Sequence, residues 1–242
     1  MDVQTAVGNY ANAIKHCKNL ETVHRAAGNG GRGRRDAETS VNRGSIVMTV
    51  AAWQAFVQDL ATALRDATFT EVGDDSDQPL LAAAMKQWRS DFDSAMGRFS
   101  TPDADQTISL LSRAGFNPRP SWSWQQQGGQ GSGPVQVEPQ HVADVIGMWL
   151  RVRHDVAHGH ATVHALPILT AVRDPKASAK LKADPTLRLT DAIDCRNFFT
   201  SVVRVTAEAA AQYVGQPSPQ WEEPSRLRLG LHPSQARKPP KA

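Results

Sequence analysis

The sequence predicts an all-α protein that folds as an antiparallel helical bundle. Apolar residues recur at every third or fourth position in five or six separate stretches of the chain. Runs in which apolar and polar residues alternate strictly, as they do in half-buried strands, are almost absent. Glycine and proline punctuate the boundaries between the helical stretches. Helices with one apolar face are stable when those faces pack against each other, so a bundle is the expected architecture.

Four helices are expected in the first half of the chain. They cover residues 3–27, residues 40–66, a stretch that begins at Pro79 and ends by Pro102, and a shorter helix capped by Asp103 or Asp105. The second helix has the clearest stripe, formed by Ile46, Val50, Trp53, Val57, Leu60 and Leu64. The stripe of the third is Leu81, Met85, Trp88, Phe92, Ala95 and Phe99. The stripe of the second helix predicts either core or a dimer seam, and Trp53 and Trp88 are both expected to be core residues.

Two more helices are expected in the second half, over residues 138–158 and 190–214. Between residues 165 and 189 the chain is punctuated by proline, and its LPILTAV segment fits either a short helical turn or an extended piece. Residues 117–138 are rich in Gly, Pro, Ser and Gln and predict a flexible loop, in which Trp122 and Trp124 either pack on the domain surface or stack on bases. Residues 216–242 lack periodicity and predict a disordered tail after one helical domain over residues 1–215.

The composition predicts a protein of the cytoplasm. Two cysteines, Cys17 and Cys195, cannot build a disulfide framework, and both fall in helical patterns where buried thiols are expected. The first residues do not resemble a secretory signal, and no apolar run approaches the ~20 residues that cross a bilayer. The net charge of +3 and pI near 9.0 permit a polyanionic partner without identifying one.

A basic, glycine-rich segment follows the first helix. Gly28, Gly30 and Gly33 match G-x-G-x-x-G, but a dinucleotide site requires a preceding strand, and here a helix precedes. The segment is therefore interpreted as a flexible loop, whose Arg32, Arg34 and Arg35 would contact RNA phosphates if RNA is the ligand.

The most informative stretch is RVRHDVAHGH, residues 151–160, at the end of the helix over 138–158. Arginine can hold phosphate oxygens with its planar guanidinium, and a histidine, with an ordinary pKa of about 6.5, can exchange a proton near neutral pH. RNA supplies its own nucleophile, the 2′-hydroxyl. A protein therefore only has to orient the strand, move a proton and stabilise the phosphate, and Arg153 and His158 are suited to these roles without a metal or another cofactor.

This stretch resembles the R-polar-x-x-x-H signature of HEPN domains, a family of helical ribonucleases of toxin-antitoxin, phage-defence and RNA-processing systems. Arg153, His154 and His158-Gly159 carry the resemblance, and residues 41–60 are similar to the long early helix of the RiboL-PSP-HEPN branch. The resemblance covers roughly residues 12–164.

The resemblance implies a homodimer in which two such elements meet in one cleft and cleave RNA without metal. Arg153 would hold the scissile phosphate, His158 would transfer a proton, His154 would fill the polar position, and Arg151 would contact RNA. An antitoxin or regulatory protein is the further partner implied, and no membrane is. Similar sequences often carry an acidic residue near the position of Gln54, so a weakened or lost activity stays open.

Five residues at about 100° each place Arg153 and His158 about 140° apart on a straight helix. Either the helix loosens before Gly159, or arginine and histidine from two chains share one cleft.

Three other interpretations compete with the nuclease. His154 and His158 with Asp155 resemble H-E-x-x-H, which would make a zinc hydrolase, although no third ligand follows at a familiar spacing. A non-catalytic module could bind RNA or a protein through Arg153 and His158. The same two residues could also merely end an exposed helix, where they interact favourably with the helix dipole.

Overall fold

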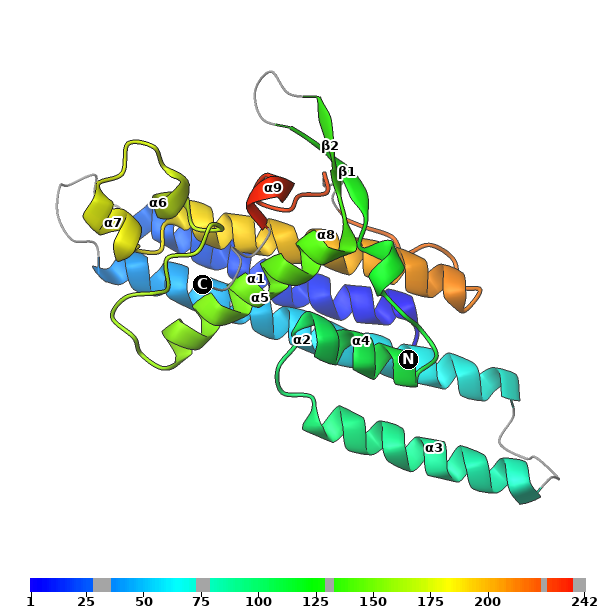
Figure 1. Cartoon of the computed structure of the whole chain (residues 1–242). Helices are drawn as coiled ribbons and strands as arrows, with labels where there is room; N and C mark the ends of the chain where they lie inside the picture. Colours follow the sequence, from blue (N-terminus) through cyan, green and yellow to red (C-terminus); the bar gives the residue numbers. More distant parts are fainter. Residues whose placement is uncertain (28–35, 73–78, 129–132, 223–225, 237–242) are drawn as a thin grey trace, which may run out of the picture.

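The computed structural model describes residues 1–27, 36–72, 79–128, 133–222 and 226–236, and it confirms the predicted helical bundle (Figure 1). Within these residues the chain forms nine α-helices, one short 3-10 helix and a two-stranded hairpin.

Three long helices form the body of the bundle. They are α1 (Val3–Ala27), α2 (Asp36–Val72) and α8 (Leu189–Tyr213), and each packs against the other two. Trp53 of α2 is fully buried and lies against Phe56 and against Phe199 of α8, with ring centroids 5.9 and 5.8 Å apart. The stripe predicted on the second helix, from Ile46 to Leu64, is core throughout. Both cysteines, Cys17 of α1 and Cys195 of α8, are free thiols buried in this core.

Helix α2 is the central element of the fold. It also contacts α4 (Ala104–Arg113) and α5 (Pro139–Ala157), so four helices surround it. Among the described residues, the stretch Ala37–Thr68 is the one helical segment long and apolar enough to meet the criteria for crossing a membrane, and 56% of its most apolar window is buried inside the bundle. Packing against four neighbours accounts for this apolar character.

Helix α3 (Pro79–Arg98) lies at the periphery, and the prediction that its stripe is core is only partly correct. Phe92 is buried, whereas Leu81 is 39% exposed and Met85 and Trp88 are half-buried. The physical reason is that α3 packs along α4 on one side, at the edge of the bundle (Figure 1). The following helix, α4, begins as predicted, because the side chain of Asp103 accepts the Gln106 N–H at 2.7 Å.

The flexible loop predicted over residues 117–138 is wrong for the part of that range that the structure describes. A 3-10 turn (η1, Arg119–Ser121) leads into an antiparallel hairpin of β1 (Trp124–Gln127) and β2 (Pro134–Val137), which projects from the bundle in Figure 1. The indole of Trp122 is fully buried and its Nε1 donates to Thr206 Oγ1 of α8 at 3.0 Å. The two tryptophans thus anchor the segment by packing, as the first of the two interpretations predicted.

The disordered tail predicted over residues 216–242 is also wrong in its described parts, 216–222 and 226–236. Leu229, Leu231 and Ala236 are buried, the last of them in a short helix, α9 (Pro233–Ala236). The side chain of Gln126 in the hairpin accepts the Leu229 N–H and donates to the Leu231 carbonyl. We call the described residues 216–222 and 226–236 the strap. The strap is irregular and is bonded to a distant segment, so it leaves no periodic signal in the sequence. Residues 165–189, undecided above, contain two short helices, α6 (Thr170–Arg173) and α7 (Ala179–Ala183).

Candidate active site at the end of helix α5

Helix α5 presents the predicted arginine and histidines at its carboxyl end. Its buried face includes Val145, Trp149 and Val152, which hold it on α2. On the opposite side Arg151, His154 and His158 are exposed, while Arg153 is half-buried.

The helix remains regular until it ends. His158 is the residue after the last helical one, and its N–H still donates to the His154 carbonyl at 3.0 Å. Gly159 then takes a left-handed conformation, with φ of 70°, and turns the chain away. Of the two arrangements considered above, loosening of the helix before Gly159 is therefore not observed, and Arg153 and His158 of one chain lie on different sides of α5.

Imidazole rings gather at this helix end. The rings of His154 and His158 lie one turn apart with centroids 4.1 Å from each other, and the ring of His160 lies 6.2 Å from that of His158. His158 thus stands between two other imidazoles on an accessible surface, where a substrate could reach it.

A buried carboxylate organises the turn that follows. Asp155 is completely buried, and its Oδ2 accepts both the backbone N–H of His164, at 2.9 Å, and a contact of 2.7 Å from Nδ1 of the same residue. Its Oδ1 lies 3.3 Å from Nδ1 of His160. Burial alone raises the pKa of a carboxyl, but these hydrogen bonds outweigh it and hold the pKa of Asp155 below its ordinary value.

A second contact fixes the same turn to the bundle. Arg43 of α2 donates from Nη1 to the His160 carbonyl at 3.0 Å and from Nη2 to the Ala161 carbonyl at 2.7 Å. The segment from His158 to His164 is therefore held at one end by the α5 carboxylate and in its middle by an arginine of the central helix.

Gln54, near whose position similar sequences often carry an acidic residue, does not lie at the histidine turn of the same chain. Its Nε2 donates to the Phe99 carbonyl at 3.3 Å, next to the link between α3 and α4. Eleven residues separate it from Arg43 along α2, which corresponds to about 16 Å of helix. Within one chain, Gln54 therefore lies on a different part of α2 from Arg43, the residue of this helix that contacts the histidine turn.

Sequence reasoning identified Arg153, His154 and His158 but missed Asp155, His160, His164 and Arg43 as a supporting set. One signal was present: Asp155 follows Val152 by three positions and so falls on the buried face of α5, where an unpartnered carboxylate would be costly. The predicted RNA-contacting residues Arg32, Arg34 and Arg35 lie outside the described residues.

The described residues do not provide a set of zinc ligands at this helix end. In the described part of the chain, no three His, Cys, Asp or Glu side chains converge in a group that could hold a metal ion. Both oxygens of Asp155 are directed at His160 and His164, so this carboxylate acts as a hydrogen-bond acceptor that orders the turn.

The fold and site define a helical-bundle protein with an arginine and a histidine cluster at one helix end. Comparison with known proteins adds no closer assignment: no protein-family model, no curated protein and no solved structure matches the chain.

Proposed function

We propose that the chain is a metal-independent endoribonuclease in which Arg153 and His158 act on an RNA phosphodiester. The observation that carries the proposal is the exposed His158 at the end of α5, one turn from His154 and five residues after a half-buried arginine. In this mechanism an imidazole accepts the proton of the RNA 2′-hydroxyl, which attacks the adjacent phosphorus. The P–O bond to the 5′-oxygen breaks, and this oxygen takes up a proton to become the 5′-hydroxyl of the second product. The guanidinium of Arg153 binds the phosphate oxygens as negative charge accumulates on them.

The turn over residues 158–164, braced by Asp155 and Arg43, supports this assignment. General acid–base catalysis requires an imidazole that stays in place relative to the phosphate, and catalytic side chains are most effective when their neighbours fix them. Asp155 holds the chain that follows His158 by accepting the His164 N–H, and Arg43 holds it by donating to two successive carbonyls, those of His160 and Ala161. The bare end of an exposed helix would need neither contact.

The first experiment compares cleavage of a mixed single-stranded RNA pool by the wild type, His158→Ala and Arg153→Ala, all in EDTA. Loss of a positioned proton-transfer group typically lowers a rate by ~10² to 10⁴, and a loss in this range is expected for His158→Ala. Products of the wild type should end in 2′,3′-cyclic phosphate. His16→Ala and Arg98→Ala, which change exposed residues on α1 and α3, are the matched controls and should cleave like the wild type.

Equal cleavage by wild type and His158→Ala would refute the proposed role of His158. Binding of RNA without cleavage by any of the proteins would instead assign the chain to the non-catalytic modules.

A mixing experiment tests whether two chains build each site. If the arginine of one chain acts with the histidine of its partner, a mixed dimer of Arg153→Ala and His158→Ala retains one intact site and loses the other. Random exchange makes half of the dimers mixed, so about a quarter of wild-type activity should return on mixing. If both residues of one chain form the site, mixing restores nothing.

A further inference from the structure

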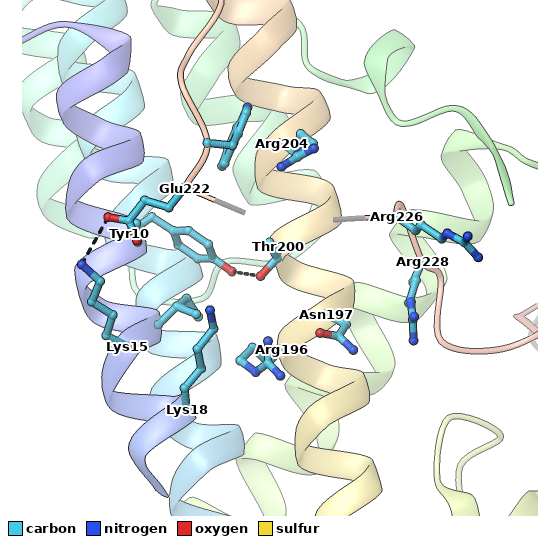
Figure 2. A pocket seen from close by; sticks show the side chains of 13 residues that line it. Tyr10, Lys15, Lys18, Arg196, Asn197, Thr200, Arg204, Glu222, Arg226 and Arg228 are labelled. Atoms are coloured by element: carbon cyan, nitrogen blue, oxygen red, sulfur yellow. Dashed lines mark hydrogen bonds and ion pairs between the residues drawn. The ribbon is translucent and has the colours of Figure 1, made fainter. Parts of the chain in front are cut away.

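A separate hollow lies between α1, α8 and the strap that follows α8 (Figure 2). It has a volume of about 410 Å³, and none of the residues that line it belongs to α5 or to the turn after it. The catalytic proposal makes no use of this hollow, so an inference about it does not depend on that proposal.

Positive charge dominates the lining. Six cationic side chains contribute to it, and Figure 2 shows them coming from three different segments: Lys15, Lys18, Arg196, Arg204, Arg226 and Arg228. Among the described residues of the lining there is one carboxylate, Glu222, which pairs with Lys15 at 3.3 Å in an exposed ion pair. Arg196 is held from behind by the largely buried Glu21, with Nε 2.6 Å from Oε1. Cations therefore outnumber carboxylates around the hollow, which favours an anionic ligand.

The rest of the lining can accommodate a ring. Tyr10 and Ile14 of α1 contribute apolar surface, and the Tyr10 hydroxyl is tied to Thr200 Oγ1 of α8 at 3.1 Å. On another wall the Arg204 guanidinium lies over the Trp221 ring at 4.8 Å, which holds this indole from the strap against α8. The amide of Asn197 adds a neutral hydrogen-bonding group.

We propose that this hollow binds a nucleoside carrying two or three phosphates. Its volume falls within the ~300 to 1,000 Å³ typical of small-molecule sites. Arginine and lysine bind phosphate oxygens through charge-assisted hydrogen bonds, while the aromatic and aliphatic surface of Tyr10, Ile14 and Trp221 would contact the base. Because the cations line one half-open hollow from three segments, α1, α8 and the strap, a compact ligand fits better than a long strand. Free nucleotides and the 5′-triphosphate end of an RNA share this chemistry.

Calorimetric titration of the full chain tests the proposal with each of the four ribonucleoside triphosphates, adenosine, pyrophosphate, and one short RNA bearing either a 5′-triphosphate or a 5′-hydroxyl. At least one triphosphate should bind, adenosine should bind at least about tenfold more weakly, and added salt should weaken the triphosphate complex. The double variant Lys18→Gln/Arg228→Gln should lower the affinity by about tenfold or more.

The control, Lys86→Gln/Lys176→Gln, removes the same charge from exposed positions outside the hollow and should change the affinity by less than about twofold. Tighter binding by the 5′-triphosphate RNA than by any free nucleotide would identify an RNA end as the source of the phosphates. The proposal is overturned if no triphosphate, free or on RNA, binds below about 1 mM, or if both double variants lose affinity equally. It is also overturned if the 5′-hydroxyl RNA binds through Lys18 and Arg228 while free nucleotides do not, because the hollow would then serve an RNA strand.

Discussion

Replacement of Asp155 should destabilise the protein, and the loss should be larger for alanine than for asparagine. In Asp155→Ala the His164 N–H and the His164 ring lose a buried acceptor at 2.9 and 2.7 Å. A hydrogen bond to a charged group is worth about 1.5 to 3 kcal/mol. The His160 contact, at 3.3 Å to a ring that is half exposed, should add little. Because the His164 ring is also half exposed and water can reach part of the site, we expect a loss of about 2 to 4 kcal/mol for the alanine variant.

Asp155→Asn should cost about 1 kcal/mol, because its amide oxygen can still accept from His164, while the charge and the weaker contact with His160 are lost. Denaturation in urea, followed by circular dichroism, measures both losses. In a chain of this length each kcal/mol lowers Tm by about 2 to 4 °C, so the alanine variant should melt at least about 4 °C below the wild type. Asp144→Ala removes a carboxylate of the same helix that accepts an exposed hydrogen bond from Gln140, and it should change stability by less than about 0.5 kcal/mol.

The stability difference between the wild type and Asp155→Asn should also depend on pH. The folded protein holds the pKa of Asp155 below the ordinary value of 3.8, so the carboxylate contributes stability above pH 3.8 that is lost as the pH falls through the lowered pKa. The difference between wild type and Asp155→Asn should therefore be complete at pH 7 and should shrink in stronger acid. A loss below about 1 kcal/mol for Asp155→Ala at pH 7, or a wild-type advantage over Asp155→Asn that persists unchanged at pH 2, would refute this account of the turn.

Three further predictions concern the rest of the fold. Trp122→Ala should cost about 3 to 5 kcal/mol in urea denaturation, because a fully buried indole and its bond to Thr206 are lost, and a cost below about 1 kcal/mol would contradict the anchored hairpin. Gly159→Ala should cost about 1 to 2 kcal/mol through its positive φ alone, since no atom lies within 4 Å of the added Cβ, whereas Gly44→Ala inside α2 should be neutral or stabilising. Burial raises the pKa of both the Cys17 and the Cys195 thiols, so Ellman's reagent at pH 8 should label neither in the native protein and both in urea, and rapid native labelling would count against this core.

The helices were predictable from the sequence because amphipathic spacing is a local property. The stripe from Ile46 to Leu64 and the Asp103 cap each involve residues within a few turns of one another. The hairpin and the strap depend instead on distant partners. Trp122 is buried by α8, and Leu229 is held by Gln126, about a hundred residues earlier in the chain. No local pattern contains that information, and a composition rich in Gly, Ser and Pro pointed in the opposite direction.

The candidate site divides in the same way. A short motif was enough to locate Arg153 and His158 at a helix end. Their angular separation follows from their separation by five positions on a regular helix. Asp155 was considered only as the counterpart of the glutamate in H-E-x-x-H, in the alternative zinc interpretation, although its hydrogen bonds run to His160 and His164 further along the chain. The contribution of Arg43 could be recognised only once α2 and the turn had been placed side by side.

These contacts change the significance of Gln54. A neutral residue there left a weakened or lost activity open, because similar sequences often carry an acidic residue near this position. In the structure Asp155 contacts His160, and the ring of His160 lies 6.2 Å from that of His158. Asp155 therefore orders the turn that follows His158 from within α5 itself. Within one chain Gln54 is bonded to the Phe99 carbonyl and lies three turns along α2 from Arg43, so a neutral side chain there leaves the contacts of this turn unchanged.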